Sequence, residues 1–523
     1  MSYRVCIPCA GTGSRLGPLT RFINKALVSV ANRPALAHII DKFPTDSEFV
    51  IALGYKGHLI KEFLALAYPS RTFFFVQVSP YEGEGSGLGR SLLACQEFLQ
   101  QPFVFNSCDT LVAETIPPPE YNWMGYAERH SFEQYRTVEL QDGLVRVIAE
   151  KSDVDDGRAK PYIGLAAVND HDEFWSMMLH GGDNAILTGE VHGLRGLLPL
   201  KIHAHGFTWH DTGNLPALER TREAYSRPNQ PNILEKANEA IWFHQGQVIK
   251  FSDDPRFIDN RVKRAGILRG YVPRITGAQP HMYSYDEAPG EVLSKVVTLP
   301  LFERLLGHCT TFWARRELAP SELHVFHNDC MKFYKEKTLE RVDLFYKTFE
   351  RCDREETIND RPTPRLSIML QGLNWDWIAA GIPGRFHGDL HFENILWNVQ
   401  DQQFTFLDWR QDFAGDLSTG DLYYDFAKIL HGLIVCHELI AANQFRIQWE
   451  ADSIDYDFHR KQVLVACEAY FYRWMVGLGF DVKKVRVLTA LIFLNIAALH
   501  HEPYGLLLYA LGKAMLASEL EGL

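Results

Sequence analysis

The chain of 523 residues is 46% hydrophobic and 23% charged, an ordinary globular composition that is too long for one core, so two or three domains are expected. Its net charge of −12 argues against nucleic acid or an anionic membrane surface as the main partner, although nucleotides need only a few local cations. The sequence has no signal-peptide layout and no apolar stretch of the roughly 18 residues that span a membrane. It therefore predicts a cytoplasmic protein that binds small molecules, without a nucleic-acid or membrane partner, and leaves the oligomeric state open.

Short apolar runs alternate with helical patterns in the first part of the chain, up to about residue 225. The runs predict strands at residues 4–9, 48–53, 72–78 and 102–106. The patterns between them predict helices at residues 34–42 and 58–67. Alternation of this kind is typical of an α/β domain with a mainly parallel sheet, and we place this domain at residues 1–227.

Nine cysteines are scattered along the chain. Cys6 and Cys9 have the spacing of a metal-binding or redox pair, but they lie in an apolar run, and the sequence has no second such pair to complete a zinc site. We therefore expect buried free thiols at these positions.

A polar, proline-punctuated stretch at residues 226–232 is the best candidate for a linker. Beyond it, apolar runs at residues 240–243 and 247–251 predict strands. Long helical patterns follow at residues 321–351 and 463–509.

This order of elements predicts a second, bilobal α+β domain. It would cover residues 232–523, with a small β-containing lobe at about 232–290 and a helical lobe at about 291–523.

The first predicted strand is followed directly by a turn that contains Gly11 and Gly13. Two glycines one residue apart let the backbone approach a phosphate and aim its N–H groups at it. Arg15 would supply charge to a triphosphate, and Lys25 follows ten residues later. The dinucleotide-binding fingerprint is incomplete, because Leu16 occupies the position of its third glycine.

The longer string around these residues, G-x-G-x-R-L-x-P-L-T followed by K-A-L and N-R-P, resembles the signature of sugar-phosphate nucleotidyltransferases. This family includes glucose-1-phosphate thymidylyltransferases, compact uridylyltransferases and bacterial choline-phosphate cytidylyltransferases. The resemblance covers roughly residues 3–225 and implies a Rossmann-like domain. In that domain Gly11 and Gly13 would bind the nucleotide, and Arg15 and Lys25 would act in catalysis.

Two aspartates resemble the metal ligands of this family. Asp109 ends the segment Asn-Ser-Cys-Asp, and Asp211 lies in Trp-His-Asp-Thr-Gly, which resembles the family's Trp-x-Asp-x-Gly motif. Nucleotidyl transfer forces two anions together, so Mg²⁺ and cationic side chains must neutralise their charge. Two carboxylates from separate strands can hold Mg²⁺ while waters and phosphate oxygens complete the octahedron.

Other segments resemble the family's substrate-binding motifs. Glu150 and Lys151 resemble its Glu-Lys pair, whose lysine contacts the acceptor phosphate, and Gly164 lies in a segment that resembles the strand lining the acceptor. A looser match, which begins at Gln77 and includes Gly87, resembles the loop that reads the nucleotide base.

The strongest local signal in the second domain is His-Gly-Asp-Leu-His-Phe-Glu-Asn, which contains Asp389 and Asn394. Protein kinases carry H-R-D-L-x-x-x-N with the same five-residue offset. Asp408 ends an apolar run fourteen residues beyond Asn394 and takes the place of the aspartate in D-F-G. This form resembles aminoglycoside phosphotransferases and choline/ethanolamine kinases, over roughly residues 232–523.

Phosphoryl transfer gives these residues their expected roles. Asp389 orients the attacking hydroxyl and accepts its proton, while Asn394 and Asp408 hold Mg²⁺ on the phosphates of ATP. His387 is expected to brace the loop.

Two residues upstream resemble the ATP-binding positions of the family: Lys250 on a predicted strand and Tyr285 in a segment similar to the adenine hinge. The segment also departs from the family. No glycine-rich loop precedes Lys250, where Gly246 stands alone. No glutamate lies between Lys250 and Tyr271 to pair with this lysine, so Asp259 is the nearest substitute.

Together the resemblances imply a bifunctional enzyme that uses ATP, a second nucleoside triphosphate and Mg²⁺ in both domains. The kinase would phosphorylate a small hydroxyl compound, a sugar or polyol being favoured. The nucleotidyltransferase would couple that phosphate to a nucleotide, release pyrophosphate and make a nucleotide-activated precursor for capsule or cell-envelope polymers. Two alternatives stay open: a choline or amino-alcohol kinase with a cytidylyltransferase, and a nucleotidyltransferase with a catalytically dead, regulatory kinase-like domain.

Overall fold

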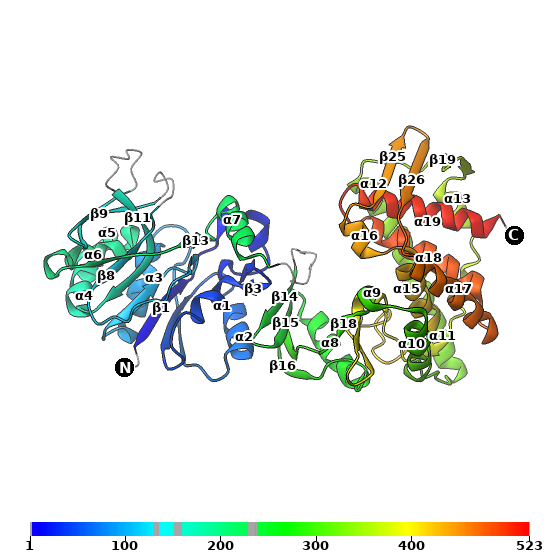
Figure 1. Ribbon diagram of the computed structural model, residues 1–523, viewed down its shortest axis with the longest axis horizontal. Coiled ribbons are helices and arrows are strands. Elements are labelled where there is room, and N and C mark those ends of the chain that lie inside the picture. Colours follow the sequence, from blue (N-terminus) through cyan, green and yellow to red (C-terminus); the bar gives the residue numbers. More distant parts are fainter. Residues whose placement is uncertain (1–2, 129–134, 151–158, 228–235, 237, 522–523) are drawn as a thin grey trace. The chain divides into compact units, whose positions relative to one another are not determined.

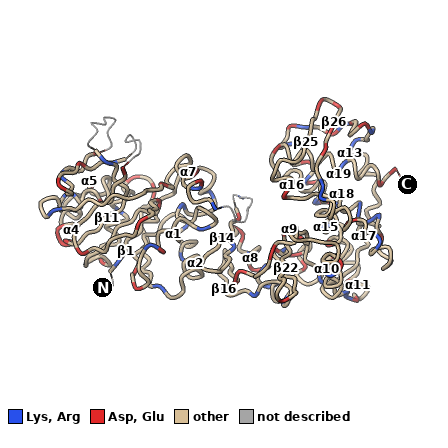
Figure 2. The backbone as a smooth tube through the Cα atoms, in the orientation of Figure 1, with Lys and Arg blue, Asp and Glu red and all other residues tan. Residues whose placement is uncertain are grey.

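The computed structural model describes residues 3–128, 135–150, 159–227, 236 and 238–521. They form two compact units, the first of Met1–Ile258 and Thr276–Asp286 and the second of Asp259–Ile275 and Glu287–Leu523. Within the described residues, no helix has both the length and the apolar composition needed to cross a membrane. Acidic and basic residues are interspersed along both units (Figure 2), so the charge at a site is set by its nearest side chains.

A mixed sheet forms the centre of the first unit (Figure 1). Among the described residues its strands lie in the order β5-β4-β1-β6-β11-β8-β12-β10-β9. Their bounds are β1 Arg4–Cys9, β4 Glu48–Leu53, β5 Phe73–Gln77, β6 Phe103–Asn106, β8 Trp123–Tyr126, β9 Thr137–Gln141, β10 Leu144–Ala149, β11 Ala159–Val168 and β12 His203–Gly206. The first four of these confirm the strands predicted from the apolar runs.

The expectation of a mainly parallel sheet is wrong beyond β6. Strands β5, β4, β1 and β6 pair in parallel, as do β8 and β12. In contrast, β11 pairs antiparallel with β6 and β8, and β10 pairs antiparallel with β12 and β9. Parallel neighbours need a long crossover, usually a helix. The alternation with helices stops at β6, and β9 and β10 are joined by Asp142 and Gly143, a two-residue turn with positive φ at both positions that makes an antiparallel hairpin.

Helices cover both faces of this sheet. On one face lie the two helices expected from the sequence, α1 Ala35–Ile40 and α2 Gly57–Ala67. On the other face lie α3 Leu88–Cys95, α4 His171–His180 and α6 Glu190–Gly196. Successive side chains of β1 alternate between the two layers, so Cys9 is buried in the first layer and Cys6 in the second. Both cysteines are free, as expected.

The order of the strands reverses at β1. The chain runs from β1 outward through β4 to β5 and then returns to β6 on the other side of β1. In open α/β sheets, ligands bind outside the carboxyl ends of the strands at such a reversal. The turn with Gly11 and Gly13 follows β1, and Asp109 follows β6. Both motifs therefore lie where the topology favours a ligand.

Smaller elements complete the unit. The remaining strands of its first 225 residues are β2 Ser29–Val30, β3 Arg33–Pro34, β7 Thr110–Val112 and β13 Trp209–Asp211. The remaining helices are α5 Gly182–Thr188 and α7 Leu215–Tyr225. Asn214 caps α7 by accepting a hydrogen bond from the Ala217 amide, which satisfies one of the free N–H groups of its first turn.

A second sheet of the first unit contains the strands expected in the small lobe. It has the order β14-β15-β17-β16, with β14 Glu239–His244, β15 Gln247–Ser252, β16 Ile275–Gln279 and β17 Met282–Asp286. One face of this sheet shares a core with α2, because Trp242, Phe251 and Met282 are buried in the same cluster as Phe63. The Trp242 and Phe63 rings meet edge to face at 5.5 Å. The domain boundary at residues 227–232 and the bilobal arrangement remain predictions.

The turn between β14 and β15 has only two residues. Gln245 and Gly246 have φ of 49° and 78°, and the flanking His244 and Gln247 are paired. Positive φ at both positions is the signature of a type I′ hairpin turn. The turn therefore has no room for a glycine-rich loop, in agreement with the sequence.

Helices make up most of the second unit. They are α8 Pro255–Ile267, α9 Leu293–Val296, α10 Leu299–Phe312, α11 Pro320–Met331, α12 Lys337–Thr348, α13 Leu366–Gly372, α14 Trp375–Ala379, α15 Leu422–Ile434, α16 His437–Ala441, α17 Gln462–Gly477, α18 Val482–Ala497 and α19 Tyr504–Leu520. The long pattern at 321–351 is divided by a π-helical turn, Lys332–Glu336, between α11 and α12. The pattern at 463–509 is divided into α17, α18 and the start of α19.

Three small sheets lie among these helices. One has the order β18-β22-β23, the next β20-β19-β26-β25, and the last pairs β21 with β24. Their bounds are β18 Glu291–Val292, β19 Glu356–Ile358, β20 Arg361–Thr363, β21 Pro383–Gly384, β22 Ile395–Asn398, β23 Gln403–Phe406, β24 Gly420–Asp421, β25 Phe445–Glu450 and β26 Ser453–Phe458.

We predict that Phe63→Ala destabilises the small sheet β14-β15-β17-β16, although Phe63 lies far from these strands in the sequence. Removing a buried aromatic ring leaves a cavity and lowers the free energy of unfolding by about 3–5 kcal/mol. Hydrogen–deuterium exchange of peptides from β14 and β15 should therefore become faster. Leu187→Ala is the control, because Leu187 is 75% exposed. Unchanged exchange of β14 and β15 in the Phe63→Ala protein would contradict a shared core.

Candidate active sites

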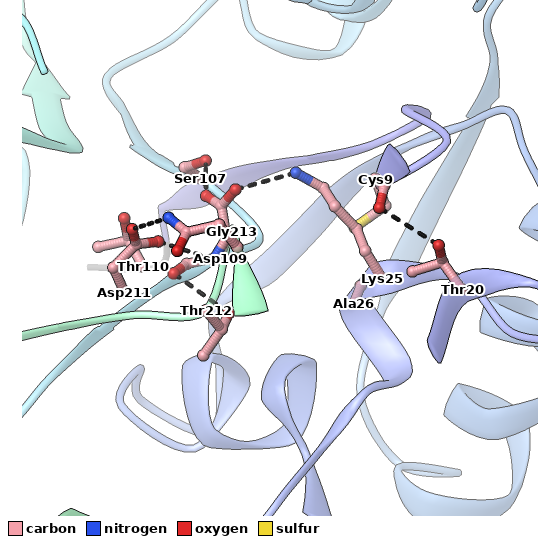
Figure 3. A network of polar contacts seen from close by, with 12 residues as sticks. Cys9, Thr20, Lys25, Ala26, Ser107, Asp109, Thr110, Asp211, Thr212 and Gly213 are labelled. Atoms are coloured by element: carbon pink, nitrogen blue, oxygen red, sulfur yellow. Dashed lines mark hydrogen bonds and ion pairs between the residues drawn. The ribbon is translucent and has the colours of Figure 1, made fainter. Parts of the chain in front are cut away.

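Asp109 and Asp211 are brought together by an antiparallel pairing of β7 with β13. Thr110, directly after Asp109, pairs with Asp211, and the Thr212 amide donates to the Asp109 carbonyl at 3.0 Å. A Cβ added at Gly213 would lie 3.0 Å from Oδ2 of Asp109 and 3.0 Å from Oδ1 of Asp211. The two carboxylates therefore converge on the same point of the site (Figure 3).

Lys25 is held against Asp109 by a buried asparagine. Its Nζ lies 3.0 Å from Oδ2 of Asp109. The side chain of Asn24, which is fully buried, donates to the Cys9 carbonyl at the end of β1 and to the Tyr55 carbonyl, and accepts from the Ala26 amide. These three hydrogen bonds fix the backbone on both sides of Lys25, so the lysine is positioned by the strand that carries the glycine turn.

The two aspartates differ in their tendency to ionise. Burial alone would raise the pKa of Asp109, but the Lys25 ammonium, the Ser107 hydroxyl and Arg15 lower it to about 2. The pKa of Asp211 is raised, by burial and by the neighbouring charge of Asp109. Two carboxylates that share a site repel each other, so a cation bound between them would stabilise both.

Arg15 faces the same point. One of its guanidinium nitrogens lies 3.4 Å from the position of a Cβ on Gly213, although the arginine itself is exposed. A side chain at Gly213 would therefore meet Asp109, Asp211 and Arg15 at once. Glycine at this position leaves the space in which the three charged groups meet.

The glycines of the nucleotide motif keep the backbone accessible. Gly13 has φ of 69°, and a Cβ there would lie 2.8 Å from the Cβ of Lys25, whereas a Cβ at Gly11 would meet nothing within 4 Å. Gly87, with φ of 151°, begins α3, and a Cβ there would lie 2.6 Å from the Ile186 carbonyl oxygen. Gln77 is exposed at the end of β5. The nucleotide-binding roles of these residues stay predictions.

Of the expected acceptor residues, Glu150 lies against two arginines. Glu150 accepts from Arg136 Nε at 2.9 Å and from Arg195 Nη2 at 2.7 Å, and both contacts counter the effect of burial and lower its pKa. Gly164, with φ of 71°, accepts a hydrogen bond from the Ser107 amide at 2.8 Å, which places it beside the Asp109 loop. Lys151 lies outside the described residues. Glu150 thus offsets the charges of two arginines, and the acceptor-binding roles of Glu150 and Gly164 stay predictions.

The donors at this site suit Mg²⁺. Among the residues that the structure describes, no group of three or more His, Cys, Asp or Glu side chains is arranged to hold a metal. Mg²⁺ is nevertheless commonly bound by one or two carboxylates together with waters and phosphate oxygens. Asp109 and Asp211 supply two carboxylates at one point, so they fit the ion and are the residues that would hold it.

We predict that Lys25→Met lowers pyrophosphate release from a nucleoside triphosphate, because Asp109 loses its cation and the site loses a positive charge. The expected fall in kcat/KM is about 10²–10³-fold, the effect of removing one preorganised charge-stabilising group. Lys61→Met, which removes an exposed lysine of the same unit, should keep the wild-type rate. Equal rates for the two variants would exclude the Lys25–Asp109 pair from the reaction.

The catalytic loop of the second unit is fixed from behind by a buried carboxylate. Asp425 accepts from the amides of His387 and Gly388, both at 2.7 Å, and from the Trp313 indole at 3.0 Å. His387 is fully buried, and its Nδ1 accepts from the Asp389 amide at 3.2 Å. Burial lowers the pKa of His387 to about 3, so the ring is neutral and can accept this bond. His387 and Asp425 therefore brace the loop that presents Asp389.

The β22–β23 hairpin brings Asn394 and Asp408 together. Asn394 directly precedes β22, and Asp408 follows β23 by two residues, while Ile395 and Phe406 are paired across the hairpin. The Leu407 amide donates to the Asn394 carbonyl at 2.7 Å. The thirteen residues between Asn394 and Asp408 are thus closed into a hairpin whose two ends meet.

Asp389 and Asp408 each have a cationic partner. Lys428 on α15 lies with Nζ 2.8 Å from Oδ1 of Asp389. Burial alone would raise the pKa of Asp389, but Lys428 and His391 hold it well below its usual range. Arg261 on α8 forms an ion pair with Asp408. Asp389, the expected base, and Asp408, an expected metal ligand, are therefore each paired with a cation from a separate helix.

The expected ATP-binding residues lie on one face of the small sheet. Lys250 on β15 pairs with Tyr283 on β17, and Val248 pairs with Tyr285. This face is opposite the one that packs on α2. Lys250 and Tyr285 belong to the first unit and Asp389 to the second, so their shared role in ATP binding stays a prediction.

Asp259, the expected substitute for the missing glutamate, is engaged on its own helix. Its carboxylate lies 2.6 Å from Nζ of Lys263, one turn further along α8, and its side chain is 56% exposed. An exposed pair of this kind is typical of a helix surface. Two other charged residues of α8 reach the catalytic segment: Arg261 pairs with Asp408, and Arg264 donates to the carbonyls of Phe386 and Arg410.

We predict that Lys428→Met lowers the kcat of ATP-dependent phosphorylation, because the carboxylate of Asp389 loses the ammonium that positions it. The expected fall is about 10²-fold, the lower end of what a positioned base contributes. Lys428→Arg keeps the charge and should recover part of the loss. Lys347→Met is the control, since the Lys347 side chain is 72% exposed. A wild-type kcat in Lys428→Met would contradict the positioning role.

Several partners of the site were missed by the sequence analysis. They are Ser107, Tyr135, Arg136, Arg195, Arg261 and Lys428. Ser107 had a signal, because it lies two residues before Asp109 in a segment that the sequence analysis singled out. Tyr135 and Arg261 had none, since each reaches its aspartate only through the folding of the chain.

The second half matches a known enzyme family. Residues 301–464 match the model described as "Phosphotransferase enzyme family". This range contains Asp389, Asn394 and Asp408, so the resemblance stated for the catalytic loop is confirmed.

The N-terminal region is similar to nucleotidyltransferases. "Bifunctional protein GlmU" of Methanococcus vannielii is 25% identical over 158 residues, which are 29% of this chain and 36% of that protein. "Probable glucose-1-phosphate cytidylyltransferase" of Bacillus subtilis is 39% identical over 62 residues, which are 12% of this chain and 24% of that protein. The chain thus spans well under half the length of these curated relatives.

A solved structure is also similar. UTP-bound UGPase from Acinetobacter baumannii aligns over 44% of this chain and 96% of that protein, with 15% identity and a TM-score of 0.37. Taken together, the sequence comparisons confirm that the first half of the chain resembles sugar-phosphate nucleotidyltransferases and that the second half resembles the phosphotransferase enzyme family.

Proposed function

We propose that the chain is a bifunctional enzyme that phosphorylates a small hydroxyl compound with ATP and then transfers a nucleotidyl group onto the new phosphate. One observation carries this proposal. Each half brings its expected metal ligands together through an antiparallel strand pairing and sets a lysine against a carboxylate of the site, Lys25 against Asp109 and Lys428 against Asp389.

The second half would carry out the first reaction. The acceptor's hydroxyl oxygen attacks the γ-phosphorus of ATP, the bond from that phosphorus to the β,γ-bridging oxygen breaks, and ADP leaves. Asp389 orients the hydroxyl and takes its proton, while Lys428 holds the carboxylate in place. Asn394 and Asp408 present amide and carboxylate oxygens, which suit Mg²⁺, and the ion neutralises phosphate charge when it is bound.

The first half would carry out the second reaction. An oxygen of the acceptor phosphate attacks the α-phosphorus of a nucleoside triphosphate, and pyrophosphate leaves. The backbone at Gly11 and Gly13 faces the triphosphate, and Arg15 and Lys25 supply positive charge where the two anions meet. Asp109 and Asp211 would hold Mg²⁺. We place both reactions in the cytoplasm, where nucleoside triphosphates are available.

The product of the two steps would be a nucleotide-activated precursor for capsule or cell-envelope polymers. A sugar or polyol is the favoured acceptor, because one similar protein is named for glucose 1-phosphate. An amino-alcohol kinase joined to a cytidylyltransferase remains the alternative. The complete catalytic loop, with its bracing residues in place, supports an active kinase over a regulatory module.

Two single substitutions should separate the reactions. Asp109→Asn should lower pyrophosphate release by about 10²–10⁴-fold and leave ATP-dependent phosphorylation unchanged, whereas Asp389→Asn should do the reverse. Pyrophosphate release would be measured with the four ribonucleoside triphosphates and dTTP against candidate phosphates. Phosphorylation would be measured as ATP consumption with sugars, polyols and amino alcohols.

Matched substitutions of exposed aspartates serve as controls. The side chains of Asp172 and Asp376 are 96% and 87% exposed, so Asp172→Asn and Asp376→Asn should keep both activities. Phosphorylation that survives Asp389→Asn would overturn the kinase assignment. Pyrophosphate release that survives Asp109→Asn would overturn the assignment of the first half.

A further inference from the structure

Three cationic side chains near the catalytic loop take no part in the contacts described above. They are Lys337 and Arg341 on α12 and Arg410, which follows Asp408 by two residues, and all three are partly buried. Within the described part of the chain, no side-chain hydrogen bond or ion pair is found for any of them, and Nε of Arg410 is buried without a partner. Partly buried cations without a counter-charge are costly, so this group needs an explanation.

One aromatic ring holds two of these cations. Nζ of Lys337 lies 4.5 Å from the centre of the Phe333 ring, and Cζ of Arg410 lies 4.7 Å from it. Phe333 is 6% exposed and stacks on Phe413 with ring centres 4.3 Å apart. It lies in the π-helical turn before α12, and such turns are frequent at functional sites. The ring fixes the positions of the cations but does not neutralise them.

The charges around Lys337 are mostly of its own sign. Arg341 lies one turn further along α12, and like charges at this spacing destabilise a helix. Burial lowers the pKa of Lys337 well below its usual value, and Arg410, Lys428 and Arg341 lower it further, while Asp389 opposes them. Because Asp389 is already paired with Lys428, the group has an excess of positive charge. An anion bound here would offset that excess.

Arg410 is packed against the loop that presents Asp389. A Cβ on Gly388 would lie 2.6 Å from Cβ of Arg410, so the arginine begins beside the residue that precedes the base. Its guanidinium then reaches the Phe333 ring, where Lys337 also lies.

The same cations are linked to Asp389 through α15. Tyr424 and Lys428 are one turn apart on this helix; the Tyr424 ring lies 5.9 Å from Nζ of Lys337, and Lys428 pairs with Asp389. In contrast, the charged partner of Asp408 is Arg261 on α8. Lys337 and Arg410 therefore lie on the side of the base, where the acceptor's hydroxyl would be.

We propose that Lys337, Arg341 and Arg410 bind an anionic group of the kinase's acceptor, so that the compound phosphorylated at Asp389 is a hydroxy acid or a phosphate ester. The proposal rests on the proposed kinase function and deepens it, because it narrows the small hydroxyl compound to one that carries an anionic group. A cationic amino alcohol would add to the excess positive charge and would be rejected. A neutral sugar or polyol would leave the three cations without a counter-charge.

Matched acceptors test the proposal by ATP consumption. One set is glycerol, glycerate, glycerol phosphate and serinol, and another is glucose, gluconate, glucose 6-phosphate and glucosamine, with choline added. We expect a carboxylate or phosphate member to be phosphorylated with the highest kcat/KM, and the two kinds of anion are distinguished within each set. Preference for a neutral or amino member overturns the proposal.

Substitutions of Lys337 and Arg410 test whether these residues bind the acceptor. In Lys337→Met and Arg410→Met the KM for the anionic acceptor should rise about 10- to 100-fold, as for the loss of one charged hydrogen bond, while the KM for ATP stays unchanged. Lys332→Met is the control, since Lys332 is exposed in the adjoining turn. An unchanged acceptor KM in both variants, or a rise confined to the KM for ATP, overturns the proposal. The second result would assign these cations to the nucleotide phosphates.

A binding measurement needs no turnover. Inorganic phosphate is the probe, followed by phosphorus-31 line broadening with Mg²⁺ and a non-hydrolysable ATP analogue present. The broadening should decrease in Lys337→Met and persist in Lys332→Met, and equal broadening in the two variants overturns the anion site. If the probe binds through Lys337 but no compound is phosphorylated, the anion site stands and the kinase function fails. If Asp389→Asn abolishes phosphorylation while Lys337→Met and Arg410→Met both leave the acceptor KM unchanged, the kinase stands and the anion site fails.

Discussion

A carboxylate held against an ammonium group is the interaction on which both sites depend. Lys25 lies 3.0 Å from Asp109, and Lys428 lies 2.8 Å from Asp389. A carboxylate that is largely removed from water would take up a proton, and the nearby lysine keeps it ionised instead. Phosphate transfer gathers negative charge at one point, so its site needs cations whose positions are set in advance. Each pair supplies both an ionised carboxylate and a fixed positive charge.

Antiparallel strand pairing assembles both sets of expected metal ligands. Asp109 and Asp211 lie far apart in the sequence and meet because β7 pairs with β13, while Asn394 and Asp408 meet because β22 and β23 form a hairpin. In the first unit this pairing lies beside a parallel part of the sheet whose strand order reverses at β1. The glycine turn after β1 and the aspartate after β6 therefore lie at the carboxyl edge where phosphate ligands bind.

The small sheet β14-β15-β17-β16 follows the expected linker in the sequence, but it packs against the domain that precedes the linker. Its core residues Trp242, Phe251 and Met282 are buried together with residues of α2. Burial of apolar surface is the main favourable contribution to folding, so these strands are stabilised by the first 225 residues of the chain. Lys250 lies on the opposite face of the same sheet and is thus carried by the first unit.

The sequence by itself determined the first four strands of the large sheet, the helices α1 and α2 and the order of the catalytic motifs. These features are local: alternating burial, turn-forming glycines and residues at fixed short offsets such as Asp389 and Asn394 are visible along the chain. The sequence analysis expected a mainly parallel sheet, but the pairs of β11 with β6 and β8 are antiparallel. The period of a strand does not reveal the direction of its neighbour.

Only the tertiary structure decided which charged groups meet. Arg261 reaches Asp408 from a helix far upstream, and Arg410 and Lys337, from separate segments, meet at the Phe333 ring. It also decided that the small sheet packs on α2. Contacts of this kind depend on packing between distant segments, which leaves no periodic or spaced signal in the chain, whereas the chemistry of each motif is written in adjacent residues.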